Sequence, residues 1–223
     1  MLKDYDDSLK NFQKEHNLTI FHLMGQHVNY KQRYRTKQAR FWASSYEDKR
    51  PELTNAQRKM LSHYDNATLY NDSIVAQIVK RFQKQDAIVI YVPDHGEECY
   101  EENRGFICRN HSAEIDWPLA HYEFEIPFWI YCSPKYIRNH RDIYRQIRKA
   151  KDKRFMTDAL PHLLLYLAGI ETPTYKEEYN ILSSKYDEMR PRILKNSADY
   201  DKLRDAYLEK EAKKKAAEEA KEK

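Results

Sequence analysis

The stretch from Ala87 to Tyr100, AIVIYVPDHGEECY, constrains the fold of this chain more than any other. Its first six residues are apolar and mostly β-branched or aromatic, which is typical of a buried strand. The run then passes without a break into Asp94, His95, Gly96 and Glu97. In an open parallel sheet, ligands bind beyond the carboxyl ends of the strands. The stretch therefore predicts a functional site at the point where a strand leaves the core.

Apolar runs and helical stretches alternate along the rest of the chain. LTIFHL at residues 18–23 and the run at 126–131 predict two more strands. Helices are predicted over residues 4–15, 54–85, 136–150 and 157–168, the last closed by Gly169. This alternation favours an α/β fold with one mainly parallel sheet and helices on both faces. The helix over 54–85 is expected to pack on that sheet.

Composition excludes several classes of protein. The 39 basic and 35 acidic residues are interspersed and give a net charge of only +4, which argues against a nucleic-acid partner. No apolar run approaches the roughly 18 residues of a membrane helix, and no signal-peptide pattern opens the chain. The chain as given is therefore expected to be soluble. Residues 1–207 are expected to form one core or part of a larger one, and 208–223 a charged helix or frayed tail.

The three cysteines leave the cellular compartment open. Cys99 and Cys108 flank one loop, so they form a disulfide in an oxidising compartment or remain two free thiols. Both alternatives stand on the spacing alone. Cys132 lies in an apolar run and is expected to be a buried thiol.

Histidines gather beside glycines at two predicted strand ends. FHLMGQH carries His22 and His27, and DHGE carries Asp94 and His95. A lone histidine on a strand is more often a hydrogen-bonded core residue, and a lone Asp-His pair is as often a simple turn. The same combination at two strand ends favours a metal site, and carboxylate with neutral imidazole suits zinc. Two further histidines follow in the next loop, His111 and His121.

Several motifs together resemble one family. They are, in order, FHLMGQHVNYKQRY, HYDNATLYNDSIVAQIV, AIVIYVPDHGEE, FEIPFWIYCSPKY, FMTDALPHLLLYLAGI and YNILSSKYDEMRPRI. This series is similar to the phosphoethanolamine transferases of the alkaline phosphatase and sulfatase superfamily, over roughly residues 10–195. The resemblance implies an alkaline phosphatase/sulfatase-like fold, here incomplete at its N-terminus.

The resemblance also implies a role for each candidate residue. Asp94 and His95 match the pair that holds the catalytic zinc. His27 matches a histidine that meets the substrate phosphate or a second zinc, and His22 a neighbouring substrate-binding histidine. His111 matches a further catalytic and substrate-binding histidine, for which His121 is the rival. Glu97 is expected to support the site by accepting a hydrogen bond. Tyr64, Asp65 and Asn66 are expected to pack or orient a loop near the site.

The implied activity is zinc-dependent transfer of phosphoethanolamine from phosphatidylethanolamine to lipid A or another envelope glycan. The family works by double displacement through a covalent intermediate on a threonine, with zinc activating that nucleophile. The implied location is the bacterial inner membrane, reached through an N-terminal membrane domain that this chain lacks, with the catalytic domain on the periplasmic side.

No threonine here stands in the family's nucleophile context. Thr19, Thr36, Thr54 and Thr68 lie in or beside predicted strands and helices. The chain is therefore interpreted as the carboxyl-terminal part of the catalytic domain, which is expected to be inactive alone. Two alternatives remain: a sulfatase or phosphoglycerol transferase of the same superfamily, and an inactive fragment.

Overall fold

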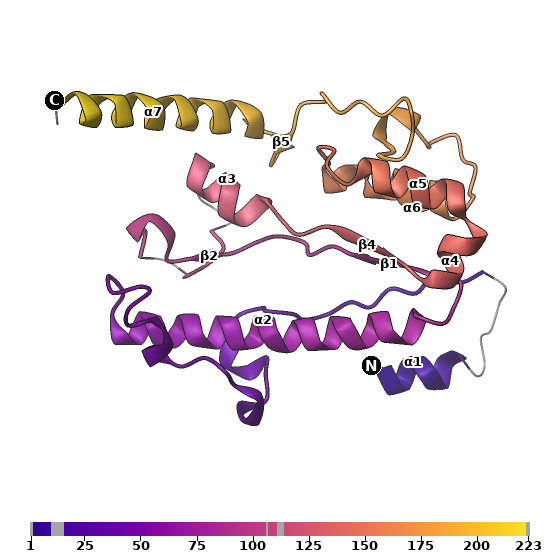
Figure 1. The fold of residues 1–223 in the computed structure, drawn as a ribbon, viewed down its shortest axis with the longest axis horizontal. Helices are drawn as coiled ribbons and strands as arrows, with labels where there is room; N and C mark the ends of the chain where they lie inside the picture. The colour runs from indigo at the N-terminus through magenta and orange to yellow at the C-terminus, as the bar shows by residue number, and fades with distance from the viewer. Residues whose placement is uncertain (1, 10–15, 106, 111–113, 222–223) are drawn as a thin grey trace. The chain divides into compact units, whose positions relative to one another are not determined.

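The computed structural model describes residues 2–9, 16–105, 107–110 and 114–221, shown in Figure 1. The chain divides into two compact units, Met1–Gln83 and Lys84–Lys223. Each unit has its own packed interior.

The first unit is built on one long helix, α2 (Asn55–Phe82). It begins at a capping box: the Thr54 hydroxyl accepts a hydrogen bond from the Gln57 backbone N–H at 3.3 Å, and the Thr54 N–H donates to Gln57 Oε1 at 2.8 Å. Its 28 residues contain neither proline nor glycine, so no residue interrupts the backbone ladder. The helix predicted over 54–85 is confirmed.

The segment before α2 packs along this helix. Three pairs of side chains fix its direction: Phe21 with Phe82, Gln26 with Thr68, and Tyr30 with Tyr64. Contacts move back along α2 as the chain advances, so the segment runs antiparallel to the helix. It continues through three short 3-10 helices, η1 (Tyr30–Gln32), η2 (Thr36–Gln38) and η3 (Ala43–Tyr46).

The predicted strand at residues 18–23 is not formed. Leu18 and Ile20 are 76% and 80% exposed, and every strand in the described part of the chain belongs to the second unit. A strand is defined by its ladder of hydrogen bonds with a neighbour, and an alternating apolar pattern does not supply that neighbour. Of the helix predicted over 4–15, α1 (Leu2–Leu9) is present, and 10–15 lie outside the described residues.

Asn66 holds a loop against α2. Its side chain is buried, and Oδ1 accepts hydrogen bonds from the backbone N–H groups of Arg40 at 2.6 Å and Phe41 at 3.1 Å. Its Nδ2 donates to the carbonyl oxygens of Phe41 at 2.8 Å and Ser62 at 2.7 Å. Both acceptor positions and both N–H donors of this buried amide are thus used, and most of these bonds hold the chain before η3. Asn66 thus orients a loop as expected, and the nearness of that loop to the site stays a prediction.

The second unit contains the predicted strands at 87–92 and 126–131, here β1 (Ile88–Tyr91) and β4 (Trp129–Cys132). They pair antiparallel, with Ile88 opposite Cys132 and Tyr91 opposite Trp129. Two smaller ladders are also antiparallel: β2 (Glu98–Cys99) with β3 (Ile107–Cys108), and β5 (Ile193–Leu194) with β6 (Ala198–Asp199). The expected parallel pairing is therefore wrong for the described strands, because apolar runs mark strands without giving their directions.

The helices of the second unit follow the sequence prediction with one break. The predicted helix over 136–150 is split at His140 (φ −126°, ψ 52°) into α4 (Pro134–Asn139) and α5 (Arg141–Ala150). The predicted helix over 157–168 is a 3-10 turn, η5 (Thr157–Ala159), followed by α6 (Leu160–Leu167). Gly169 ends it with a φ of +64°, a left-handed conformation that glycine adopts without strain. Besides the C-terminal helix, the remaining helices are η4 (Glu101–Asn103), α3 (Trp117–Phe124) and η6 (Glu177–Tyr179).

Two apolar clusters form the interior of the second unit. The larger joins β4, α5 and α6 around buried Ala150, Leu163, Ile181 and Leu182. The smaller joins α3 to the C-terminal helix around Ala120, Leu194 and Tyr200.

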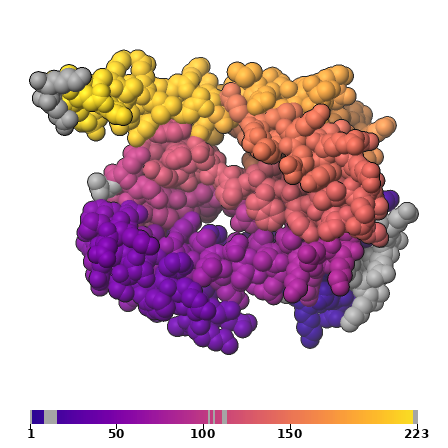
Figure 2. Space-filling model, in the orientation of Figure 1, coloured from indigo at the N-terminus to yellow at the C-terminus, as the bar shows by residue number. Residues whose placement is uncertain are grey.

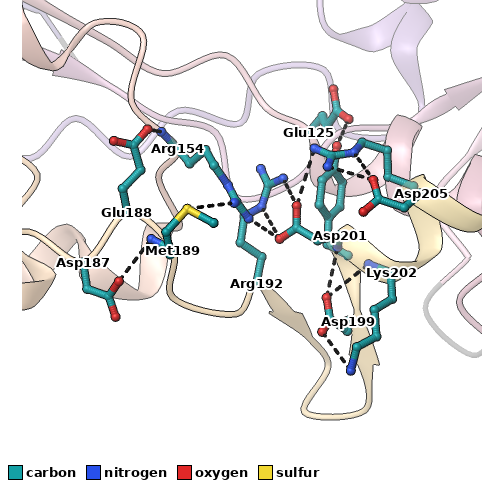
Figure 3. Close-up of polar contacts among 12 residues, drawn as sticks. Glu125, Arg154, Asp187, Glu188, Met189, Arg192, Asp199, Asp201, Lys202 and Asp205 are labelled. Carbon is teal, nitrogen blue, oxygen red and sulfur yellow. Dashed lines mark hydrogen bonds and ion pairs between the residues drawn. The ribbon is translucent and has the colours of Figure 1, made fainter. Parts of the chain in front are cut away.

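The C-terminal helix, α7 (Tyr200–Lys221), is a single element that runs through residue 207. In Figure 2 it forms a yellow ridge that begins against the part containing α3. Its first turn is anchored by Asp201, which accepts hydrogen bonds from the guanidinium groups of Arg192 and Arg154 (Figure 3). The rest of α7 is exposed and charged.

Cys99, Cys108 and Cys132 are present as thiols and not in disulfides. Cys99 and Cys132 are buried, and the register of the β2–β3 ladder places Cys99 opposite Ile107. Among the described helices, none combines the length and apolar character that crossing a membrane requires.

Candidate metal centre

The chain leaves β1 at a proline. Pro93 has no backbone N–H and does not extend the β1–β4 ladder, so the following residues turn away from the strand. Asp94 comes next, with 86% of its side chain exposed, and then His95, with 23% exposed. The predicted site residues of this unit therefore follow a strand end, as the sequence indicates.

Gly96 fixes the turn that presents these two side chains. Its N–H donates to the Glu123 carbonyl oxygen at 2.8 Å, next to the C-terminal end of α3. A Cβ atom at position 96 would lie 2.2 Å from the Tyr122 carbonyl oxygen. Such a contact is much closer than two non-bonded atoms tolerate, so only glycine allows the backbone to approach α3 this closely.

The imidazole of His95 is held by the backbone of the next residue. Nδ1 lies 2.7 Å from the Gly96 carbonyl oxygen, and a carbonyl oxygen only accepts, so Nδ1 carries the proton. Nε2 then keeps its lone pair, and it accepts a hydrogen bond from Arg109. A histidine whose Nδ1–H is bound to a carbonyl oxygen and whose Nε2 is unprotonated has the form that ligates metal ions.

The distance between the two candidate donor atoms fits zinc. Asp94 Oδ2 and His95 Nε2 lie 3.5 Å apart. Tetrahedral zinc with ligands at about 2.0–2.2 Å places neighbouring donors about 3.4 Å apart. The pair therefore has the spacing of two neighbouring zinc ligands, and Arg109 would have to leave Nε2 for a zinc ion to bind there. No group of three or more His, Cys, Asp or Glu side chains suited to a metal is found within the described ranges.

His27 shows the same local arrangement in the first unit. Its Nδ1 lies 2.9 Å from the Val28 carbonyl oxygen, so Nδ1 carries a proton, and Nε2 is the ring nitrogen not used in this contact. Arg33 donates to the carbonyl oxygens of His27 at 2.8 Å and Val28 at 2.9 Å, which fixes this backbone. His27 and the nearby His22 are both exposed. They belong to the first unit, and Asp94 and His95 belong to the second.

Of the two candidate histidines His111 and His121, the structure describes only His121. His111 lies outside the described residues. His121 lies on α3, where Nδ1 is 2.9 Å from Glu125 Oε1 and the ring stacks on Trp117 with centroids 5.5 Å apart. Its contacts thus serve the packing around α3. Glu97 follows Gly96 and is half-buried, and its supporting role remains a prediction.

Sequence reasoning missed three charged residues near the turn. Glu98 is only 1% exposed, and Arg104 binds its carboxylate with both Nε at 2.7 Å and Nη2 at 3.2 Å. Arg104 also donates to Asp116 at 2.8 Å, which ties β2 to the start of α3. Arg109, the third, contacts His95 directly. Arginine at these positions carries no sequence signal that separates it from an ordinary surface cation.

Comparison with known proteins identifies the family. The family model for Sulfatase matches residues 1–170. The chain belongs to the sulfatase family. The resemblance drawn from the motifs is confirmed by the relatives, which are named phosphoethanolamine transferases.

One such relative is phosphoethanolamine transferase EptC of Escherichia coli, 31% identical over 191 residues that make up 84% of this chain and 31% of the relative. Another, from the same species, is Kdo(2)-lipid A phosphoethanolamine 7''-transferase, 31% identical over 61% of this chain and 23% of that protein. This sulfatase-family chain thus spans about a third of the length of the curated relatives it matches.

Solved structures confirm the sulfatase-like fold. The C-terminal periplasmic domain of Escherichia coli EptC superposes with a TM-score of 0.73 at 28% identity, over 91% of this chain and 57% of that domain. The same domain has also been solved in complex with zinc, with the same TM-score and identity. The family and its fold are therefore established for this chain.

Proposed function

We propose that this sulfatase-family chain is the part of a phosphoethanolamine transferase that supplies Asp94 and His95 to a catalytic zinc ion. The observation that carries the proposal is the Asp94–His95 pair, with donor atoms 3.5 Å apart and an unprotonated Nε2. The names of the relatives and the zinc complex of a structural neighbour support it.

The proposed reaction moves phosphoethanolamine from phosphatidylethanolamine to lipid A or another envelope glycan on the periplasmic side of the inner membrane. One relative is named for Kdo(2)-lipid A, and the neighbouring structures are periplasmic domains, which supports this acceptor and this location. Zinc, when bound, would supply positive charge that activates a nucleophile and stabilises charge on the phosphate oxygens.

The residues of this chain have separate tasks in that reaction. The Gly96 carbonyl holds His95 in the tautomer that ligates metal. Arg109, next to Nε2 in this structure, has a guanidinium group suited to a phosphate oxygen once the metal takes its place on His95. His22, His27 and His111 remain proposed as the histidines that bind the transferred phosphate and assist proton transfer.

The chain alone is expected to transfer no measurable phosphoethanolamine. The described part offers the Asp94–His95 pair but no group of three or more candidate ligands, and a double displacement requires a nucleophile. The test is a transfer assay with labelled phosphatidylethanolamine on the chain and on a chimera. The chimera joins the preceding part of Escherichia coli EptC to this chain.

Transfer by the chimera, lost in Asp94→Ala and His95→Ala, is the expected result. A matched control is His140→Ala, which removes a histidine that is paired with Asp86 at 3.3 Å in the same unit. Robust transfer by the 223-residue chain alone would contradict the assignment of its role. Release of sulfate from a sulfate ester, or transfer from phosphatidylglycerol in preference to phosphatidylethanolamine, would favour the alternative activities.

A further inference from the structure

A cavity lies in the second unit, among residues that the proposed reaction does not use. It has a volume of about 380 Å³. Its walls come from α5, from α6 and from the segment that contains η6, which pack together around Leu163, Ile181 and Leu182. Ligand-binding cavities commonly measure about 300–1,000 Å³, so this one is large enough for a small sugar.

The positive charge at this cavity is not neutralised by the protein. Lys149 and Lys153 line it, and Glu177 is its one acidic residue. Glu177 is paired with Lys185 at 2.8 Å, a lysine outside the cavity lining. Within the described residues, Lys149 has no carboxylate at ion-pair distance. An anionic group would therefore find an available ammonium group at Lys149.

Lys153 is fixed in place without losing its capacity to donate. Its Nζ donates to the Ile181 carbonyl oxygen at 3.1 Å and lies 5.3 Å from the centre of the Tyr186 ring. An ammonium group has three N–H donors, so two remain. A positioned donor loses less conformational entropy on binding than a free lysine side chain does.

Neutral donors complete the lining. Ser184 has no hydrogen-bond partner within the described ranges, and Ser183 Oγ accepts from the Lys185 N–H at 3.0 Å, which leaves its own proton free to donate. The Gln146 side chain accepts from the Tyr166 hydroxyl at 2.8 Å through Oε1, so its NH₂ group is not used in that bond. These side chains offer N–H and O–H donors, so a complementary ligand must carry oxygen acceptors.

We propose that this cavity binds an anionic sugar, a hexose-sized ring that carries one phosphate group. Lys149 and Lys153 bind the phosphate group. Ser183, Ser184 and Gln146 donate hydrogen bonds to oxygens of the sugar. The rings of Tyr166 and Tyr175 give the cavity an apolar surface for the C–H face of the sugar. Inorganic phosphate alone uses the charge but leaves most of the volume and the neutral donors unsatisfied. The proposal requires neither zinc nor transferase activity.

The test is a titration of the 223-residue chain with glucose 6-phosphate, inorganic phosphate and glucose, followed by amide chemical shifts and calorimetry. Glucose 6-phosphate is expected to bind more tightly than the other two and to shift the amide signals of Lys149, Ser183 and Ser184. Equal affinity for inorganic phosphate would overturn the proposal, because the sugar would then contribute nothing. Absence of shifts at these residues would overturn it as well.

Substitutions locate the site. Lys149→Ala is expected to weaken binding of glucose 6-phosphate about tenfold and Ser184→Ala about threefold, the usual effects of losing one charged and one neutral hydrogen bond. Lys151→Ala is the matched control: it removes the same charge two residues away, from an exposed lysine outside the cavity lining. Equal losses of affinity in Lys149→Ala and Lys151→Ala would indicate non-specific attraction and would overturn the proposal. Unchanged affinity in Lys149→Ala would overturn it as well.

Discussion

At the scale of single residues, the turn after β1 depends on one glycine. Asp94 and His95 are presented by a backbone that passes so close to α3 that position 96 has no room for a Cβ atom. Sequence reasoning singled out this glycine because it lies beside Asp94 and His95 at a predicted strand end. It did not reveal the close approach to α3. The atom that a Cβ would meet is the carbonyl oxygen of Tyr122, which lies far along the chain beyond the β2–β3 ladder.

Gly96→Ala is expected to destabilise the second unit by about 3 kcal/mol, the cost of forcing backbone atoms apart in a packed region. Gly105→Ala is the control. A Cβ atom there would meet nothing within 4 Å, and only the φ of +69° is unfavourable. A left-handed conformation costs alanine about 1 kcal/mol. Urea unfolding measures both variants, and a loss in Gly96→Ala no larger than the loss in Gly105→Ala would mean that crowding against α3 does not make Gly96 necessary.

At the scale of secondary structure elements, local signals predicted the helices well and the strands poorly. The α2 helix has a capping box at Thr54 and no interrupting residue, so its limits follow from neighbouring residues alone. The direction of β4 relative to β1 depends on the path of the chain between them, which no local pattern contains. The segment at 18–23 has the apolar alternation of a strand but packs against α2 instead.

Thr54→Ala is expected to destabilise the first unit by about 1 kcal/mol, because the cap leaves an N–H group at the start of α2 without its acceptor. Thr54→Ser keeps the hydroxyl and should retain most of the stability. Thermal unfolding by circular dichroism measures the difference. If the serine and alanine variants lose the same stability, the capping hydrogen bond does not stabilise α2.

Asp201 is expected to make the attachment of α7 sensitive to acid. Hydrogen bonds from Arg192 lower the pKa of this carboxyl group below its usual value. A lowered pKa in the folded state contributes stability above the unfolded pKa of about 3.9, and that stability is lost as the pH falls through the folded pKa. Asp201→Asn should therefore cost about 2–3 kcal/mol at pH 7, by leaving the arginines without their carboxylate, and less at pH 3.

Asp205→Asn is the control for that comparison, since the Asp205 side chain is 66% exposed and pairs only with Arg204 within the described residues. It should change the free energy of unfolding by less than about 0.5 kcal/mol at either pH. A loss in Asp201→Asn that is the same at pH 7 and pH 3 would argue against the charged network shown in Figure 3.

At the scale of the whole molecule, the order of the motifs carried more information than any element. Six motifs in the order of one family predicted the sulfatase-like fold that the family match and the solved structures confirm. The sequence predicted Asp94 and His95 at a strand end, where the structure has them, and their role as zinc ligands remains a prediction. Glu98, Arg104 and Arg109 were not predicted. Their contacts join residues 6 to 14 positions apart, and no helix or strand periodicity in the sequence indicates such pairs.

Zinc binding by the 223-residue chain tests the central claim most directly. Calorimetric titration should show weak binding of one zinc ion, because two protein ligands hold zinc less tightly than a complete set of four. Asp94→Ala and His95→Ala should abolish this binding. Asp86→Ala removes the carboxylate of the other Asp–His pair in the second unit and should leave it unchanged. Zinc binding that persists in Asp94→Ala, or that is lost in Asp86→Ala instead, would contradict the assignment of the metal centre.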